Sequence, residues 1–315
     1  MDYRKEDIET AKAYLEDPDK YVREFVVTIN KKLRHITTYA ATDEGFALKQ
    51  LHRRMSWIIK TQYRTSSHSY AYKKRKSIID CLENHLGSST FLKADIHAYF
   101  DSIDYDILAE GLLRKKTAEE KQVHEIMLRS CFYKGHLPIG FISSPILSDA
   151  YLRNVDRHFS KMNGIIYTRY ADDLIISCKE GMEDSLPTIK QQLSDSLARY
   201  KLELNSKKTY IRKLKHTGDS IHLLGVNLVS KGDGTNRITV SDRYLRQISM
   251  DYGKVLAVQE DDNLKDYKEL VVKGKIRFVY DCSQESYSKL KKIIFMKTGA
   301  QEKVIDRFIG IKSRG

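Results

Sequence analysis

The chain of 315 residues is poor in cysteine and proline and has no long apolar run. Its four cysteines stand far apart, without the spacing of metal ligands: Cys81, Cys131, Cys178 and Cys282. They are therefore expected to be free thiols in a reducing compartment. No apolar run approaches the roughly 18–20 residues that span a bilayer, and the charged N-terminus lacks a signal-peptide core. These absences argue against a secreted or membrane protein and predict a cytoplasmic location without a membrane partner.

Linkers and repeats are missing as well, whereas positive charge is abundant. Four prolines and the lack of low-complexity tracts favour one multi-lobed unit over domains joined by linkers. Lysine and arginine total 55 against 42 acidic residues, which gives a formal net charge of +13 and a pI of about 9.3. A basic surface attracts phosphate backbones through counterion release, although this charge alone also fits an ordinary soluble protein.

Two basic segments are candidates for contact with nucleic acid. Residues 73–76 form a basic run beside Tyr70 and Tyr72, and this mixture suits a single strand, although a solvated loop fits it equally well. Near the C-terminus, residues 289–294 alternate lysine with leucine and isoleucine as in an amphipathic helix. Its lysines are free either for a duplex backbone or simply for solvent. The acidic segment over residues 259–269, with acids at 260–262, predicts a turn between helices of this region.

Two adjacent acids, Asp172 and Asp173, lie between two apolar stretches. Residues 165–167 and 174–176 are expected to form two strands, which places the acids in the tight turn of a β-hairpin. Adjacent carboxylates repel each other unless a cation offsets their charge. A bare Asp-Asp pair is usually a solvated turn, but the apolar strands on both sides favour a metal site here.

A third acid, Asp95, ends a short apolar strand over residues 91–95. A two-metal phosphoryl-transfer site needs carboxylates from separate strands to bridge ions roughly 3.5–4 Å apart. Mg²⁺ binds a few carboxylates together with waters and substrate phosphates. Asp95, Asp172 and Asp173 are therefore predicted to hold two Mg²⁺ ions, or Mn²⁺ in their place, with a nucleoside triphosphate as the completing ligand.

These motifs resemble those of a known family. Asp95 followed five residues later by Phe100, and then the Tyr170-Ala171-Asp172-Asp173 hairpin, look like motifs A and C of reverse transcriptases. Four further segments resemble family motifs in the required order, from a basic fingers strand to motifs B, D and E: residues 31–36, 137–148, 202–209 and 222–226. Together the matches span about residues 30–230.

The small size narrows the resemblance to compact bacterial enzymes, namely retron reverse transcriptases and a defence-associated, abortive-infection-like group. Three departures from the retron pattern stand out. Ile139 replaces a glutamine in motif B, residues 81–82 read Cys-Leu instead of Asn-Ala, and residues 223–225 read Leu-Leu-Gly instead of Val-Thr-Gly. The Leu-Pro-Ile-Gly form of motif B favours the defence-associated group, and a retron enzyme that makes RNA-linked DNA remains the alternative.

The resemblance implies an α+β chain with the right-hand polymerase fold. Fingers are expected over residues 1–90, an antiparallel-sheet palm over 91–230 and a small, helical, basic thumb over 231–315. Within the palm, the pattern predicts one helix over residues 146–162, a hairpin over 165–178, a helix over 183–200 and strands over 209–213 and 222–229.

The resemblance also implies roles for individual residues. Asp95 and Asp172 would bind both metal ions directly, and Asp173 would be a weaker or outer ligand. The carbonyl of Ile96 would join the ion that carries the triphosphate. Phe100 would be the steric gate that crowds a 2′-hydroxyl and favours dNTP substrates, although a plain core phenylalanine is the competing interpretation.

Basic and small residues complete the predicted site. Lys32 and Arg34 are candidates for neutralising the triphosphate, and the sequence leaves open which one points inward. Lys208 is the candidate general acid for pyrophosphate, with Lys207 as its rival because strand neighbours point in opposite directions. Tyr170 would pack near the primer end. Gly140 would let the backbone approach the nucleotide.

The serines of motif B have two competing interpretations. Ser143 and Ser144 would bind template or nucleotide, or simply cap a helix.

The predicted function is RNA-directed DNA polymerisation, with an RNA template that is a partner non-coding RNA, a DNA product and an anti-phage setting. A protein partner or a second copy of the chain is left open. Protein-primed or template-independent DNA synthesis is an alternative. A non-catalytic scaffold is disfavoured by the intact acid set, and an RNA-dependent RNA polymerase by Tyr170, Ala171 and Phe100.

Overall fold

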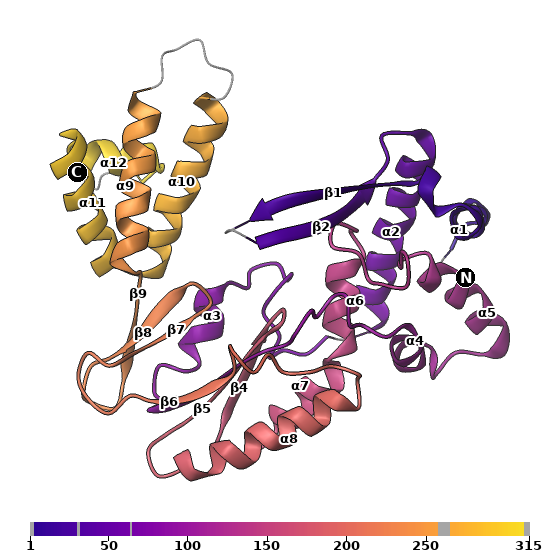
Figure 1. Cartoon of the computed structure of the whole chain (residues 1–315), viewed down its shortest axis with the longest axis horizontal. Coiled ribbons are helices and arrows are strands. Elements are labelled where there is room, and N and C mark those ends of the chain that lie inside the picture. The colour runs from indigo at the N-terminus through magenta and orange to yellow at the C-terminus, as the bar shows by residue number, and fades with distance from the viewer. Residues whose placement is uncertain (1–2, 30–31, 64, 258–264, 312–315) are drawn as a thin grey trace. The chain divides into compact units, whose positions relative to one another are not determined.

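The structure is a computed structural model that describes residues 3–29, 32–63, 65–257 and 265–311 (Figure 1). The chain divides into two compact units, one of Met1–Asn84 with Thr90–Arg212 and one of His85–Ser89 with Lys213–Gly315. The predicted three-lobe division into fingers, palm and thumb stays a prediction beside this two-unit division. None of the described helices is both long enough and apolar enough to cross a membrane.

The central sheet has four strands in the order β4-β5-β3-β6. Their bounds are Thr90–Asp95 (β3), Ile166–Tyr170 (β4), Asp173–Cys178 (β5) and Tyr210–Lys213 (β6). β3 is antiparallel to β5, and β5 to β4. The apolar residues of β3 and β5 are almost all buried, as in strands that are covered on both faces. The predicted strand over 91–95 and hairpin over 165–178 are therefore confirmed.

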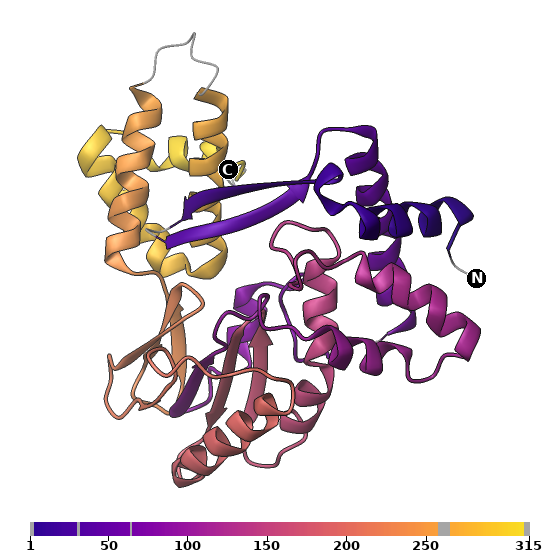
Figure 2. The same ribbon diagram turned by 45° about the vertical axis from the view of Figure 1, so that its right-hand side comes forward.

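Eight helices and a second hairpin surround this sheet in the described part of the first unit. The helices are α1 (Lys5–Glu16), α2 (Asp43–Gln62), α3 (Ile78–Glu83), α4 (Tyr105–Leu113), α5 (Ala118–Arg129), α6 (Ser144–Tyr151), α7 (Arg153–Phe159) and α8 (Leu186–Ala198). The hairpin joins β1 (Val22–Ile29) to β2 (Lys32–Tyr39). Figures 1 and 2 show it, in indigo, extending away from α2.

Two predicted elements are wrong in detail. The single helix expected over 146–162 is divided into α6 and α7, because Leu152, with φ −92° and ψ 5°, departs from helical geometry. The strand expected over 222–229 is a hairpin of β7 (Ser220–Leu223) and β8 (Val226–Ser230). Its turn residues, Leu224 and Gly225, both have positive φ, at 50° and 88°.

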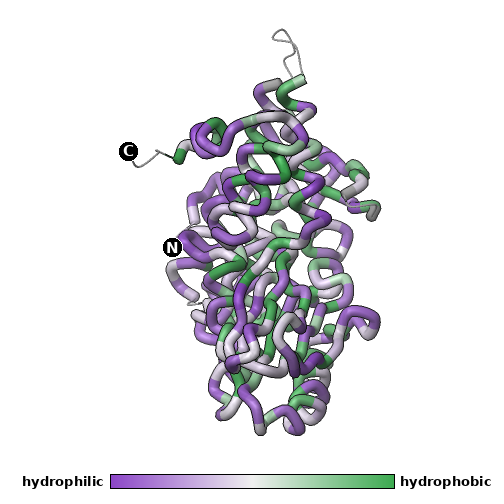
Figure 3. The backbone as a smooth tube through the Cα atoms, turned by 90° about the vertical axis from the view of Figure 1, so that its left-hand side faces the viewer, coloured by the Kyte–Doolittle hydropathy of each residue, from purple (hydrophilic) through white to green (hydrophobic). Residues whose placement is uncertain are grey.

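The second unit combines a small sheet with a helical bundle. The sheet order is β7-β8-β9, with β9 at Asn236–Thr239. The Asn236 side chain donates hydrogen bonds to the carbonyls of Leu86 and Ser88, which ties residues 85–89 to this unit. The bundle helices are α9 (Asp242–Leu256), α10 (Lys265–Cys282), α11 (Gln284–Thr298) and α12 (Glu302–Phe308). Figure 3 shows hydrophobic and hydrophilic residues alternating along the helices, as amphipathic packing requires.

The amphipathic pattern over residues 289–294 is confirmed in α11, but its lysines are not all free. Leu290 and Ile294 are fully buried. Lys289 pairs with Asp242 at 2.7 Å, and Lys291 pairs with Glu302 at 2.8 Å. Lys289 and Lys292 are both exposed, and Lys291 is partly buried. The turn predicted over residues 259–269 is wrong from residue 265 onward, where α10 begins, and residues 259–264 lie outside the described part of the chain.

Candidate active site

The chain reverses between β4 and β5 at Ala171 and Asp172, where Ala171 adopts a left-handed conformation with φ +57°. Asp173 is the first residue of β5 and lies directly opposite Asp95, the last residue of β3. The Ile96 amide donates to the Asp172 carbonyl at 3.1 Å, which extends the pairing by one residue. The sheet therefore brings all three predicted carboxylates to one end of the same strand pair.

Asp95 and Asp172 open into a cleft of about 680 Å³ built entirely from the first unit. Its lining residues come from six parts of the chain: Leu33 and Arg34 of β2, Tyr72, most of residues 95–101, residues 139–141 with 144–145, Asp172, and Asn205 with Lys208. The cleft thus combines acidic groups, cations and aromatic rings. Asp173 and Tyr170 are not among the lining residues found in the described part of the chain.

Crowding of the carboxylates changes their acidity. Burial raises the pKa of Asp172, and the nearby Asp95 raises it further, while Lys208 and Arg34 oppose the change. Burial and then the neighbouring Asp172 raise the pKa of Asp173 to about 6. Both carboxylates are thus partly desolvated beside like charges, so a cation at this end of the sheet would stabilise them.

Lys208 supplies such a cation in the structure. Its Nζ lies 2.6 Å from Oδ2 of Asp95, which is 5% exposed. Within the described ranges, no three acidic, histidine or cysteine side chains are arranged to hold a metal ion in this conformation. The donors are nevertheless carboxylate oxygens, the ligands that hard divalent ions prefer, and the ammonium occupies Asp95 as a stand-in cation. The residues therefore fit a divalent metal by their chemistry.

The choice between Lys207 and Lys208 depends on a turn, not on a strand as predicted. Asn205 accepts the Lys207 amide on its side chain at 3.2 Å and the Lys208 amide on its carbonyl at 3.0 Å. The Asn205 amide in turn donates to the Asp95 carbonyl at 2.7 Å. This turn fixes the lysines to the end of β3, with Lys208 lining the cleft and Lys207 exposed.

Of the two basic fingers residues, Arg34 lines the cleft. Lys32 begins β2, but its side chain lies outside the described part of the structure. Phe100 also lines the cleft, is half-buried, and stands edge-on to Tyr99 with ring centroids 5.8 Å apart. Phe100 therefore has both a face toward the cleft and a side against the core. Ile96 is 1% exposed and contributes backbone to the same wall.

Close packing requires a glycine at position 140, and the sequence did not reveal this requirement. Its φ is +123°, and a Cβ built on it would lie 2.3 Å from the Thr37 carbonyl oxygen. The Thr37 amide donates to the Ile139 carbonyl at 3.0 Å, so this loop lies directly against β2. Any side chain at Gly140 would push the loop and β2 apart. The glycine thus lets this loop pack against β2 and form part of the cleft wall. This structural role is separate from any contact with a nucleotide.

The serines after this loop do not cap α6 through their side chains. Ser143 occupies the N-cap position without a side-chain cap bond. Both hydroxyls are buried, and that of Ser144 has no hydrogen-bond partner within the described residues. Because unsatisfied buried hydroxyls are costly, the Ser144 hydroxyl on the cleft wall is available to a ligand.

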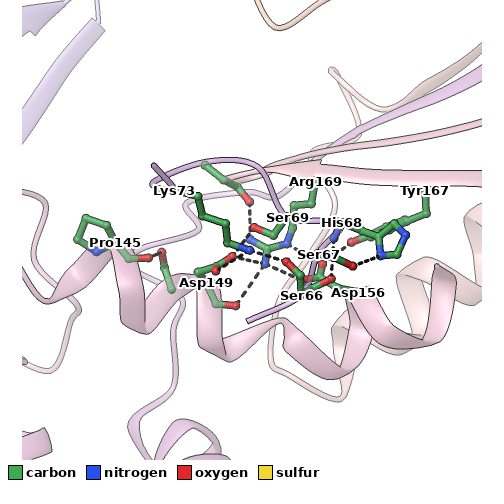
Figure 4. A network of polar contacts seen from close by, with 12 residues as sticks. Ser66, Ser67, His68, Ser69, Lys73, Pro145, Asp149, Asp156, Tyr167 and Arg169 are labelled. Carbon is green, nitrogen blue, oxygen red and sulfur yellow. Dashed lines mark hydrogen bonds and ion pairs between the residues drawn. The ribbon is translucent and has the colours of Figure 1, made fainter. Parts of the chain in front are cut away.

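Arg169 in β4 supports the carboxylate turn from behind, and sequence reasoning missed it. The side chain is 1% exposed and lies between the carboxylates of Asp149 on α6 and Asp156 on α7 (Figure 4). Its Nη2 is 2.8 Å from Asp149 and 2.7 Å from Asp156. Its Nη1 donates to the Ala171 carbonyl at 3.2 Å, inside the turn that carries Asp172. A buried cation therefore holds the turn by its backbone.

The same network accounts for part of the basic run at residues 73–76. Lys73 is mostly buried, with its Nζ 3.5 Å from Asp149, and it donates to the Ser66 carbonyl. Ser69 donates to Asp149, and the backbone of residues 68–70 bonds to Arg169 on both sides. Lys73 is thus a structural residue. Tyr72, directly before it in the chain, has a left-handed backbone conformation with φ +62° and lines the cleft. Tyr70 is buried and lies beneath the Lys76 ammonium.

An antiparallel sheet that presents acids at a tight hairpin, beside a third acid on the neighbouring strand, is the palm of a right-hand polymerase. The arrangement confirms the predicted α+β polymerase fold. The Sicinivirus 3Dpol RNA-dependent RNA polymerase shares this fold, with a TM-score of 0.54 and 11% identity over 98% of this chain and 71% of that one. At such low identity the likeness concerns the fold alone.

Sequence comparison identifies the family within that class. Residues 27–228 match the family described as reverse transcriptase (RNA-dependent DNA polymerase), and the chain belongs to it. The chain is 25% identical over 259 residues to the retron Ec83 reverse transcriptase of Escherichia coli, covering 78% of this chain and 79% of that relative. It is 27% identical over 195 residues to the retron Ec86 reverse transcriptase of Escherichia coli, covering 59% of this chain and 58% of that relative. The predicted retron-like family is confirmed.

Proposed function

We propose that the cleft extends a primer 3′-hydroxyl with deoxynucleotides copied from an RNA template. The observation that supports this most strongly is the convergence of Asp95, Asp172 and Asp173 at one end of the sheet, with the pKa values of Asp172 and Asp173 raised. A site that gathers three carboxylates beside basic side chains suits the transfer of a nucleotidyl group from a triphosphate.

Asp95 and Asp172 are the proposed ligands of two Mg²⁺ ions, because both line the cleft. Asp173 is paired with Asp95 in the sheet and is not among the lining residues, so its proposed role is to add negative charge beside the two ligands. Bound ions of this kind activate the attacking hydroxyl and neutralise the leaving pyrophosphate. The carbonyl of Ile96, next to Asp95 in the chain, is the proposed additional oxygen ligand.

Two cations from different parts of the cleft lining would bind the triphosphate and protonate the leaving pyrophosphate. Arg34 lines the cleft and presents a guanidinium fork that suits phosphate oxygens. Lys208 starts from its pair with Asp95, and we propose that it moves from that carboxylate to the pyrophosphate oxygen and donates a proton there. Its position on the Asn205 turn keeps the ammonium within reach of Asp95.

The remaining cleft residues would select and position the substrate. The half-buried ring of Phe100 would crowd a 2′-hydroxyl and so select deoxynucleotides. Tyr72 and the Ser144 hydroxyl complete the wall on the other side of Asp172. Tyr170, outside the cleft lining, would support the primer end through the hairpin instead of touching the nucleotide.

The natural template is proposed to be a non-coding RNA made with the protein, and the setting anti-phage defence. The retron reverse transcriptases with which the chain aligns support the compact retron-like architecture. Membership in the defence-associated group stays a prediction that rests on Ile139 and the other motif departures. Protein-primed synthesis is the second candidate, because tyrosine hydroxyls are plentiful, with 20 tyrosines in the chain.

The test is to purify the protein from its native locus, keep its bound nucleic acid, and add labelled dNTPs with Mg²⁺. Asp172→Ala/Asp173→Ala serves as the inactive control. DNA that depends on both acids and on an RNase-sensitive, co-purified RNA supports the proposal. Product that survives RNase and stays attached to protein favours protein priming, and no product from the wild-type preparation contradicts both.

A further inference from the structure

The exposed face of α2 carries a row of aromatic and basic side chains that the cleft does not use. Phe46 and Trp57 are each 61% exposed, which is unusual for large apolar side chains. Arg53 and Lys60 are exposed and Lys49 is half-buried. These five residues, together with Gln50, are called the α2 stripe below.

The spacing of the α2 stripe places it on one side of the helix. Each of the six residues, at positions 46, 49, 50, 53, 57 and 60, lies three or four positions from another member, which is the repeat of a single helical face. The stripe is about 21 Å long at 1.5 Å per residue. The opposite face of α2 is buried through Leu48, Leu51 and Ile58. The stripe is therefore a surface feature and not part of the core.

The charge of the α2 stripe is of one sign. No aspartate or glutamate occurs between Gly45 and Gln62 of this helix. Among the described residues, no carboxylate forms an ion pair with Lys49, Arg53 or Lys60. Arg53 reaches no further than its neighbour Gln50 in the same stripe, at 3.5 Å. Three cations beside two exposed rings thus stand without acidic partners, which favours a polyanionic ligand.

Aromatic rings interleaved with cations are the combination that binds a single strand of nucleic acid, because bases stack on the rings and phosphates meet the cations. A protein partner is less suited to this surface, since lysine is depleted in protein interfaces and two of the three cations here are lysines. A duplex offers no free base faces to Phe46 and Trp57. The chemistry of the stripe therefore specifies an unpaired strand.

We propose that the α2 stripe binds single-stranded RNA outside the catalytic cleft. No residue of α2 lines the cleft as described, so this is a second binding surface. Trp57 and Phe46 stack on bases, while Arg53 and Lys60 contact phosphates. Binding requires no metal ion and no catalytic carboxylate, so the inference goes beyond the proposed polymerase activity and can fail independently of it.

Trp57 makes the test direct, because it is the single tryptophan of the chain. Its fluorescence is titrated with a 20-nucleotide oligouridylate RNA, using nucleic-acid-free protein at 50 and 200 mM salt. We expect saturable quenching that weakens at least tenfold at the higher salt. Phe46→Ala is expected to weaken binding at least fivefold, through loss of stacking.

Two double charge-reversal variants distinguish RNA binding at the α2 stripe from non-specific attraction of RNA to a basic protein. Arg53→Glu/Lys60→Glu is expected to weaken binding at least tenfold. Arg157→Glu/Lys161→Glu changes the net charge equally at exposed positions on α7 and just after it, and is expected to change affinity less than twofold. Circular dichroism checks that both double variants are folded.

Three results would overturn the inference. These are the absence of Trp57 quenching, equal loss of binding in both charge-reversed variants, and quenching by anionic phosphatidylserine vesicles but not by RNA. The same titration with Asp172→Ala/Asp173→Ala is expected to match the wild type. Absence of polymerisation by wild-type protein that still shows Trp57 quenching would refute the catalytic proposal alone, so the two failures are distinguishable.

Discussion

The two β-hairpins of the first unit bring opposite charges to the same cleft, yet they are built in different ways. In β4–β5, the core side chains are buried and Arg169 ties the turn to two helices. In β1–β2, Phe25, Val26 and Leu33 are 45%, 52% and 72% exposed, and the outer part is held chiefly by its own strand pairing. The acids are thus fixed by the core, whereas Arg34 lies on a hairpin with several apolar side chains exposed.

This difference has a physical basis. Carboxylates that share a metal site must be held close despite their repulsion, and only a packed scaffold resists that repulsion. A phosphate-binding arginine needs less rigidity in the free protein, because its guanidinium binds the phosphate only after the substrate has diffused into the cleft. The contrast predicts that removing a cation from β4–β5 lowers chiefly the stability of the protein. Removing a cation from β1–β2 should lower chiefly the affinity for the substrate.

The largest expected effect comes from Arg169→Met. This change leaves Asp149 and Asp156 buried without their cation, and we expect the free energy of unfolding to fall by about 3–5 kcal/mol. Arg34→Met is the matched control on the exposed hairpin, with an expected change of about 0.5 kcal/mol or less. Urea unfolding followed by circular dichroism measures both, and equal losses in the two variants would contradict the comparison.

Phe100→Ala tests the floor of the cleft between the hairpins. Removing the ring is expected to raise the use of ribonucleotides relative to deoxynucleotides by about tenfold or more, because a steric barrier disappears. The measurement is kcat/KM for dUTP and UTP on one RNA template. Phe100→Tyr, which keeps the ring, is the control that should retain discrimination. An unchanged ratio in the alanine variant would identify Phe100 as a core residue alone.

Asp173→Asn tests the electrostatic strain in the buried hairpin. Because its folded-state pKa is raised to about 6, the folded protein binds more protons than the unfolded chain between about pH 4 and pH 6. Its contribution to the free energy of unfolding therefore falls as the pH rises through this window. Asp173→Asn should remove that contribution and stabilise the protein above pH 6 by roughly 1–2 kcal/mol, allowing for partial exposure.

Thermal unfolding of the wild type and of Asp173→Asn between pH 4 and pH 8 measures this effect. Parallel stability curves for the two proteins would show that Asp173 carries no strain.

The smallest expected effect is that of Arg34→Met on substrate binding. Loss of one charge-assisted contact is expected to raise KM for dNTP by about tenfold, with kcat nearly unchanged. Steady-state incorporation with varied dNTP measures it, and Arg23→Met, on the same hairpin outside the cleft lining, is the control. A fall in kcat at constant KM would assign Arg34 to the chemical step instead.

The sequence allowed the palm to be predicted because its strands are short apolar runs that end at acids. The register Asp95–Asp173 follows from such strands when they pair. The turn around Asn205 was not predictable, since its form depends on hydrogen bonds to the Asp95 backbone. The separation of Lys207 from Lys208 therefore required coordinates.

Arg169 was missed because it stands inside a catalytic motif and looked like part of its pattern. Asp149 and Asp156 offered a signal, because two acids seven residues apart would share one face of the single helix expected over residues 146–162, beside its apolar residues. Buried carboxylates need a cation as partner, and the hairpin expected over residues 165–178 offered Arg169. The structural role of Lys73 depends on its ion pair with Asp149 in the same network, so it too could not be predicted from the sequence.

The most direct test of the account is single-nucleotide primer extension on a defined RNA template by Asp172→Asn, with stability measured alongside. The account predicts a loss of at least about 10³-fold in rate for an enzyme at least as stable as the wild type, because a strained charge has been removed from the fixed hairpin. Extension within about tenfold of the wild-type rate by the folded variant would contradict the claim that this hairpin carries the chemistry.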